Sequence, residues 1–541
     1  MSKSKSLLSA GLSLSFFTLC SRILGLVREM TKAAFLGTSK YADAFGIAFM
    51  IPNLLRRLFA ENSISVAFIP TFKGYLEDSD SDEGKKTIRE FLSATITLIA
   101  FLTTCVVLIG ILATPLIVKI FLDNSDTALL HETTILTRIM FPYLVVISIA
   151  AFFQGVLNGV KIFSPSGFTP VLFNSIVIAA TYILTPILTN NIEDSELKAQ
   201  MAARAMSIGV ISGGCVQALF QLPFVLKTGW RFHFTTLQNA FNNPGTRKVM
   251  KLIVPTIIGM ACYQLNDVVS TALAGKAGTG IVSSLQYSLR LQELILGIFA
   301  VSIGTVILPD LSGLAKKQLW EDFNKMLVQA AKIMALISIP ITFLSLLCGE
   351  EIISLVYKSK KFSDESVRLT LVAFRMHIAG LFFIALNRII SPAFYAQGNT
   401  KSPTVAGIIG FAVNISLAFA VIILHNDGTG AGIALALSVA SFTNTVALFV
   451  FLKKNQSLDV KSVTLGTIFY AAKLVVLSLI ACVPAFFVRK AVLPIFEGHG
   501  RLIGFGVPLA VTAICYGAIG IVLLVITKDE IVKVILRKVR R

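Results

Sequence analysis

The stretch FLSATITLIAFLTTCVVLIGILATPLIV, residues 91–118, decides the fold class, because none of its 28 side chains is charged. As a helix it is long enough to cross about 30 Å of hydrocarbon. Similar stretches recur from one end of the chain to the other, and we place about 14 of them. Only helices and closed barrels satisfy their backbone in lipid, and long uninterrupted segments are helices. The sequence therefore predicts an all-α polytopic membrane protein.

The composition agrees with this prediction. Of the 541 residues, 55% are hydrophobic and 14% are charged, whereas a soluble domain carries about 25% charged residues. The mean hydropathy is +0.79. The predicted spans are 7–35, 41–70, 88–121, 131–159, 167–188, 201–226, 246–275, 280–308, 324–358, 368–397, 401–424, 429–453, 463–488 and 502–527.

The net charge of +19 does not indicate nucleic-acid binding, because the basic residues lie mostly in short loops between apolar spans. Placing both termini in the cytoplasm assigns roughly 25 Lys and Arg to inside loops and tails and about 10 to outside loops. The loop between Lys227 and Lys251 contributes most to this bias. The basic tail 528–541 is expected on the anionic inner leaflet. These features predict a multi-pass membrane protein with both termini in the cytoplasm.

An internal repeat suggests how the spans are organised. Phe153-Gln154-Gly155 leads to Ser164-Pro165 and Asn174, and Tyr395-Ala396-Gln397-Gly398 leads to Ser402-Pro403 and Asn414. The copies precede the fifth and eleventh predicted spans, so they run in the same direction through the membrane. The repeat predicts two parallel six-helix lobes around a central cleft. The predicted parts are the lobes 1–228 and 229–455, an additional helix pair 456–527, and the tail 528–541.

Charged residues inside the predicted spans are candidates for function, because each costs about 2.5–3.5 kcal/mol at a helix centre. Arg22, Arg28 and Arg290 lie deep in their spans. Gly25 permits a bend that would let Arg22 and Arg28 face one cavity. Asp43, Glu61, Asp267 and Glu293 lie in the same predicted spans or beside them. Arg56, Arg57 and Glu61 lie near one another and toward the end of a span, where long side chains also reach the interface or form structural ion pairs.

A cleft that contains arginines selects anions, because guanidinium groups bind phosphate oxygens bidentately and keep their charge. A carrier of a diphosphate-linked lipid needs such a cationic cavity, whereas an exporter of cationic drugs needs an acidic or neutral one. The sequence favours the lipid carrier. An enzyme is disfavoured, because the histidines lack metal-ligand spacing and there is no Walker motif.

Several motifs are specific enough to suggest a family. They are SRILGLVR (21–28), DAF (43–45), IPNLLRRLFAE (51–61), AFIP (67–70), YSLRLQE (287–293) and GTVILP (304–309). The chain resembles the MurJ (MviN) family of lipid II flippases. That family belongs to the multidrug/oligosaccharidyl-lipid/polysaccharide (MOP) exporter superfamily.

The resemblance implies that lipid II, an undecaprenyl-diphosphate-linked peptidoglycan precursor, moves from the inner to the outer leaflet by alternating access. It also implies that the lipid tail lies in a groove formed by the last two helices. The residues implied to bind substrate are Arg22, Arg28, Arg56, Arg290 and Asp43. Within the same motifs, Ser21, Asn53, Arg57, Glu61 and Glu293 are secondary candidates.

Some members of the resembled family carry a sodium site. Asp267 and Asn414 match two of its ligands, but Ala418 stands where the pattern has a second acid. We therefore expect no cofactor beyond a sodium ion at Asp267 and Asn414, and we favour transport that does not need it. The expected partners are lipid II or a similar polyprenyl-diphosphate lipid, membrane lipids and the cell-wall synthesis machinery. The alternative functions are a flippase for another polyprenyl-diphosphate oligosaccharide and a cation-coupled multidrug exporter.

Overall fold

The computed structural model describes the backbone of residues 2–58, 67–78, 80–123, 126–424, 429–453 and 458–531. Within these ranges it describes all side chains except those of 2–15, 254–263, 298–306, 308 and 429. The protein is 87% helical, and the described residues form no strand. The predicted all-α fold is confirmed. Backbone contacts divide the chain into two compact units, Met1–Val282 and Ser283–Arg541.

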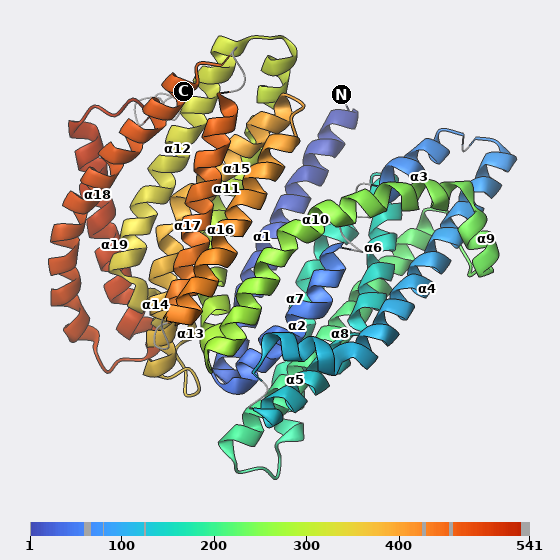
Figure 1. Ribbon diagram of the computed structural model, residues 1–541, viewed down its shortest axis with the longest axis horizontal. Helices are drawn as coiled ribbons and strands as arrows, with labels where there is room; N and C mark the ends of the chain where they lie inside the picture. Colours follow the sequence, from blue (N-terminus) through green and yellow to red (C-terminus); the bar gives the residue numbers. More distant parts are fainter. Residues whose placement is uncertain are drawn as a thin grey trace. The chain divides into compact units, whose positions relative to one another are not determined.

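The first unit contains ten helices in its described part (Figure 1). They are α1 (Ser2–Leu36), α2 (Lys40–Arg56), α3 (Ile69–Leu76), α4 (Asp82–Phe121), α5 (Thr127–Met140), α6 (Tyr143–Gly159), α7 (Ser164–Leu188), α8 (Ser195–Lys227), α9 (Leu237–Asn242) and α10 (Pro244–Ala277).

The second unit begins within the first turn of α11. Its helices are α11 (Ile281–Lys316), α12 (Trp320–Leu347), α13 (Gly349–Tyr357), α14 (Asp364–Ala379), α15 (Leu381–Ala396), α16 (Lys401–Leu424), α17 (Thr429–Leu452), α18 (Val460–Phe496) and α19 (Arg501–Ile526).

Local sequence signals explain where many helices begin. The side chains of Ser81, Asp126 and Asn243 accept hydrogen bonds from backbone N–H groups in the first turns of α4, α5 and α10. Such caps satisfy donors that have no partner inside the helix. Pro165 and Pro244 occupy the first turns of α7 and α10, where proline's missing N–H costs nothing.

Every predicted span coincides with a helix or a pair of helices. The predicted span 41–70 covers α2 and only the first two residues of α3, and residues 59–66, which include Glu61, lie outside the described part. Nine helices of the described chain are long and apolar enough to cross a membrane, and the bent pair α14–α15 would make a tenth. At 17 residues α2 is shorter than a span, and α1, α10 and α11 each include undescribed side chains. The count of 14 therefore stays a prediction.

Helix packing within each unit involves close backbone contacts at glycine. In the first unit α7 packs along α8, where Gly213 and Gly209 lie against Phe173 and Val177. In the second unit α16 packs along α17, with Gly410 against the Ala440 carbonyl. Small residues are favoured at such interfaces because they let two membrane helices approach closely.

The two helices α7 and α16 begin at the two copies of the internal repeat, and each packs most extensively on the helix that follows it. The predicted lobe boundary after residue 228 stays a prediction. The compact units divide later, after Val282, because α9 and α10 pack against α4.

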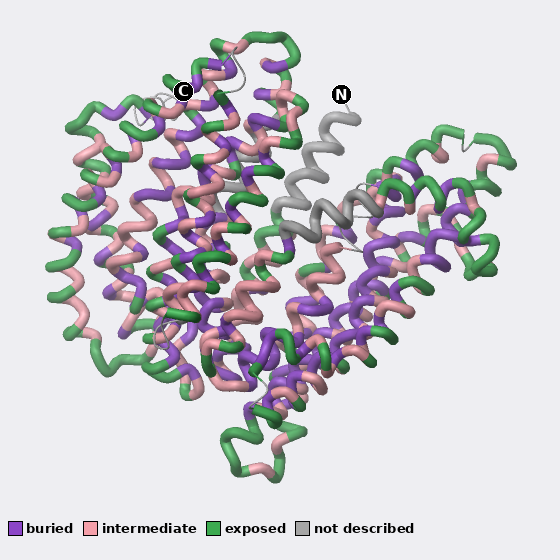
Figure 2. The backbone as a smooth tube through the Cα atoms, in the orientation of Figure 1, coloured by how far each residue is buried: buried purple, intermediate pink, exposed green. Residues whose placement is uncertain are grey.

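Burial differs strongly between helices (Figure 2). In α5 and α6, 61% of the most apolar segment is buried, whereas in α19 the share is 11%. Large apolar side chains such as Phe487 on α18 and Ile514 on α19 are exposed. In a membrane protein such side chains face lipid tails, which are as apolar as they are.

Candidate substrate site

Arg28, on α1, is the best-defined intramembrane arginine. Its Nη1 donates to Asn174 Oδ1 at 3.2 Å, and its Nη2 donates to Glu29 Oε1 at 2.8 Å. The guanidinium carbon lies 5.6 Å from the ring centre of Phe49 and 5.9 Å from that of Phe173, within cation–π range. The side chain is still 19% exposed. Arg28 is therefore held in place but remains accessible to a further anion.

Asn174 fixes α7 against α1. While its Oδ1 accepts from Arg28, its Nδ2 donates to the backbone carbonyl of Ser21 at 3.2 Å. Ser21 thus contributes a carbonyl to this contact. Sequence reasoning did not include Asn174 in the site, although the internal repeat had already singled it out. A polar residue repeated inside an apolar span is the signal that identifies it.

Arg22 lies six residues before Arg28 on the same helix and is half-buried. No hydrogen bond or ion pair joins it to another described residue. Gly25, where we expected room for a bend, lies within one continuous helix. On a straight helix Arg22 and Arg28 point about 120° apart.

Lys32 is a buried cation that sequence reasoning missed. It is 3% exposed, and its Nζ lies 6.0 Å from the ring centre of Phe45. The carboxylates of Glu29 and Asp43 attract its positive charge. Lys32 lies inside the predicted span 7–35 and one turn after Arg28, so the argument that singled out the arginines applies to it as well.

Asp43, near the start of α2, is 3% exposed. Its Oδ2 accepts a hydrogen bond of 2.5 Å from the backbone N–H of Gly280. Gly280 has a φ of 83°, a conformation that glycine adopts without steric cost. It lies in the short connection between α10 and α11. Asp43 therefore fastens α2 to this connection.

The end of α2 carries a second polar cluster. Arg56 Nε donates to Asn53 Oδ1 at 3.0 Å. Arg57 Nη1 donates to Gln264 Oε1 at 3.1 Å and lies 3.6 Å from Asp267 Oδ2. Both members of that ion pair are partly exposed, at 38% and 60%. The predicted sodium ligand Asp267 is thus next to the guanidinium group of Arg57, the residue that caps the C-terminal end of α2.

The remaining predicted residues belong to the second unit. Arg290 Nη1 lies 3.3 Å from Glu293 Oε2 on the same face of α11. Asn414 is buried in α16, and Ala418, one turn later, is buried too. Among the described residues, no three His, Cys, Asp or Glu side chains are grouped as metal ligands. The sodium site at Asp267 and Asn414 stays a prediction.

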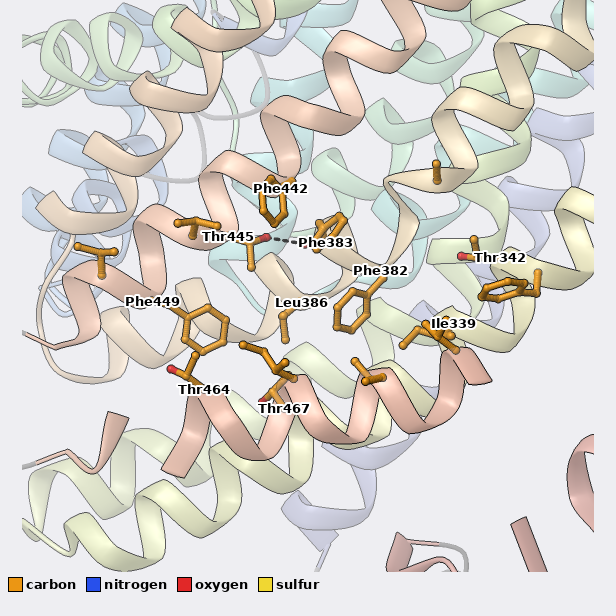
Figure 3. Close-up of a pocket in the computed structure, with 18 of the residues that line it drawn as sticks. Ile339, Thr342, Phe382, Phe383, Leu386, Phe442, Thr445, Phe449, Thr464 and Thr467 are labelled. Atoms are coloured by element: carbon orange, nitrogen blue, oxygen red, sulfur yellow. Dashed lines mark hydrogen bonds between the residues drawn. The ribbon is translucent and has the colours of Figure 1, made fainter. Parts of the chain in front are cut away.

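The second unit also contains an apolar cavity of about 740 Å³ (Figure 3). Its walls come from α12, α14, α15, α17 and α18, and α19 does not line it. Phe382, Phe383 and Phe449 point into it together with aliphatic side chains. Among the described residues that line it, Lys453 is the one that carries a charge. Such a cavity accepts a flexible hydrocarbon chain and excludes a charged group.

A polytopic helical membrane protein with accessible guanidinium groups in its spans and a separate apolar cavity has the features of a transporter for anionic amphiphiles. The sequence model of the family described as lipid II flippase MurJ matches residues 32–497. The chain belongs to the MurJ family of lipid II flippases.

Individual relatives agree with this assignment. A probable lipid II flippase MurJ of Treponema pallidum (strain Nichols) is 46% identical over 543 residues, covering 100% of this chain and 99% of that protein. The lipid II flippase MurJ of Burkholderia cenocepacia is 31% identical over 454 residues, covering 83% and 84%.

Solved structures share the fold. A lipid II flippase MurJ in an inward closed conformation superimposes with a TM-score of 0.73 at 25% identity, over 94% of this chain and 98% of that one. An inward-facing multidrug resistance transporter of the MATE family, in the MOP superfamily, has a TM-score of 0.63 at 13% identity, over 84% and 99%. The second likeness concerns the fold alone.

Proposed function

We propose that this chain carries lipid II from the inner to the outer leaflet of the bacterial inner membrane. A charged, sugar-bearing head group does not cross hydrocarbon unaided at a useful rate, because charged groups lose their hydration there. The protein replaces that hydration with fixed guanidinium groups, while the lipid tail stays in an apolar environment. The observation that carries the proposal is the geometry around Arg28.

Arg28 meets the needs of a diphosphate ligand. Asn174, Glu29 and two aromatic rings orient its guanidinium group, and about a fifth of the side chain stays exposed. One carboxylate does not exhaust the five N–H donors of a guanidinium group. A diphosphate would compete with Glu29 for these donors. When the diphosphate leaves, Glu29 takes the donors back, so binding stays reversible. Arg22, Arg56 and Arg290 supply further positive charge along the route.

The apolar cavity is the proposed position of the polyprenyl tail. Its volume of about 740 Å³ falls within the range of ligand pockets, roughly 300–1,000 Å³. Of the predicted additional pair, α18 forms one wall, and α12, α14, α15 and α17 form the others. The tail then lies between the additional pair and the second predicted lobe.

Alternating access requires contacts that form in one state and break in another. The hydrogen bond from Gly280 to Asp43 is the contact we assign to this role, because it joins α2 to the connection that leads into the second unit. We place both termini in the cytoplasm, on the charge distribution of the loops. This orientation puts Asp43 and Gly280 near the outer surface.

Depletion of the protein in cells, followed by tracking of lipid intermediates, tests the function. Accumulation of lipid II in the inner leaflet, reversed by the wild-type gene, is the expected result. Accumulation of another polyprenyl-diphosphate oligosaccharide would instead identify the alternative substrate. Normal distribution of all such lipids, with loss of drug efflux, would favour the multidrug exporter.

A further inference from the structure

The bend between α14 and α15 brings unusual polar contacts into the second unit. The two helices meet at Gly380 with an angle of 41°. A side chain at Gly380 would approach the Cα and Cβ atoms of Ser438, on α17, within 2.9 and 2.8 Å. Those distances are shorter than atoms tolerate, so α17 passes against the bend with no room for a larger residue.

At the bend the backbone N–H of Gly380 donates to the carbonyls of His377 and Ile378 instead of the Met376 carbonyl that a straight helix would offer it. Side chains of three other helices reach them. Ser438 Oγ donates to the Met376 carbonyl at 2.6 Å, and Thr342 Oγ1, on α12, lies 3.5 Å from the Ile378 carbonyl. The third helix is α11, whose Gln292 Nε2 donates to the His377 carbonyl.

The imidazole of His377 makes a second contact with α11. Its Nδ1 is hydrogen-bonded to Ser288 Oγ at 2.7 Å, and both side chains are completely or almost completely buried. Ser288 and Gln292 are one turn apart on the same face of α11. Arg290 lies between them in sequence, about 200° around the helix from Ser288. The position of Arg290 is thus set by contacts on the opposite face, made to one residue of α14.

The same bend continues into the wall of the apolar cavity. Ala379 and Phe382, on either side of Gly380, both line the cavity. Thr445 Oγ1, on α17, lies 3.4 Å from the Phe383 carbonyl (Figure 3). The same hydroxyl donates to Asn387 Oδ1 at 2.8 Å. A change in the packing of Phe382 or Phe383 therefore acts directly on the bend.

We propose that His377 is a positioning residue that couples the lipid tail to the head-group arginine of α11. This inference rests on the proposed function, because it requires a tail in the cavity. A tail that packs against Phe382 and Phe383 fixes the bend, and His377 transmits the bend to Ser288 and Gln292. Arg290 then takes up its working position only when the tail is seated. The protein in this way discriminates a lipid-linked head group from a free one.

The test uses the purified full-length protein in liposomes and two substrates with the same lipid II head group. One carries a full-length polyprenyl tail, and the other a tail of a few isoprene units. The measured quantities are kcat and KM for translocation of each substrate. Wild type should translocate the long-tailed substrate faster. His377→Leu should lower kcat for that substrate by about three- to tenfold, the range of hydrogen bonds between membrane helices, and leave the short-tailed substrate unchanged.

Conservative and control variants separate positioning from general damage. His377→Asn places an amide near the position of Nδ1 and should restore most of the tail dependence. Thr370→Val alters a buried side chain of the same helix, α14, and should change neither substrate. If His377→Leu does not fold, Gln292→Met and Ser288→Ala leave the imidazole in place. Each should reduce the ratio of kcat for the long-tailed substrate to kcat for the short-tailed one.

Three results would overturn the coupling while leaving the proposed function intact. They are a wild type that is insensitive to tail length, a His377→Leu variant with an unchanged ratio, and equal loss for both substrates. A wild type that translocates neither substrate would instead refute the proposed function.

Discussion

The two units use their buried polar side chains differently. In the first unit, Asn174 and Glu29 converge on a charge, the guanidinium group of Arg28. In the second, Ser438 and Gln292 converge on backbone carbonyls beside an apolar cavity. On the proposed function, this difference assigns Arg28 of the first unit to the anionic head group, and it gives the second unit both Arg290 and the cavity for the tail.

The internal repeat makes this difference informative. Asn174 and Asn414 come from matching positions on α7 and α16, and both are buried. In the first unit the asparagine orients a cation by bonding to Arg28. In the second it lies one turn beyond Gly410, whose backbone approaches α17. Matching scaffolds therefore carry different chemistry, and substitutions in one unit should affect a different part of the substrate than substitutions in the other.

The largest effect is expected for Arg28→Ala. Removing a partly buried charge that pairs with an anion costs about 2–5 kcal/mol, which is roughly thirtyfold or more in rate. Arg28→Lys should recover only part of the activity, because lysine lacks the planar fork. The measurement is translocation in liposomes, with complementation of a depleted strain beside it.

Arg368→Ala is the matched control, since Arg368 forms an exposed pair with Glu365. Exposed pairs contribute little, so this variant should behave as wild type. Full complementation by Arg28→Ala would show that head-group recognition does not depend on the first unit.

A smaller effect, about tenfold, is expected for Asp43→Asn, because hydrogen bonds to charged groups contribute about 1.5–3 kcal/mol. The amide still accepts from Gly280, but without the charge. The balance between inward-open and outward-open states should shift, as measured by the accessibility of single cysteines on the two sides. Glu321→Gln, which removes an exposed pair with Lys325, serves as the control. An unchanged accessibility pattern would contradict the role given to Asp43.

Much of this architecture could be predicted from the sequence because it follows from local signals. Many helix ends lie within a few residues of the predicted span ends, but α11 and α18 each extend eight residues beyond theirs. Arg22 and Arg28 stand out in the sequence because charge is rare in apolar stretches. The pairing of Arg57 with Asp267 was not predicted, because it joins residues 210 positions apart. The bend at Gly380 also escaped prediction, because a glycine inside an apolar segment has several structural explanations.

The role proposed for the apolar cavity of the second unit, as the binding site of the lipid tail, is tested by filling the cavity. Leu386→Trp places a larger ring among the lining residues, and overpacking costs about 1–3 kcal/mol. Translocation of the long-tailed substrate should fall about fivefold, while the short-tailed substrate is unaffected. Phe487→Trp, on the lipid-exposed surface of α18, should change neither. Equal losses for both substrates would show that the cavity supports the fold rather than the tail.

The smallest effect is expected at Asp267, whose substitution tests whether translocation is coupled to sodium. A sodium ion prefers several oxygen ligands, yet the carboxylate of Asp267 lies 3.6 Å from the guanidinium group of Arg57, and Ala418 supplies no second acid. Asp267→Asn should therefore change the translocation rate by less than about twofold, as expected for a partly exposed ion pair.

Replacing sodium with potassium at constant membrane potential should have as little effect as Asp267→Asn. Collapsing the potential at constant sodium should slow translocation, because moving one charge through 100 mV is worth about 2.3 kcal/mol and the arginines are charges that shift between states. The rate is measured in vesicles with the two variables set independently. A loss of activity on sodium removal alone, reproduced by Asp267→Asn, would assign the driving force to sodium, and Asp267 would then act as an ion ligand as well as the partner of Arg57.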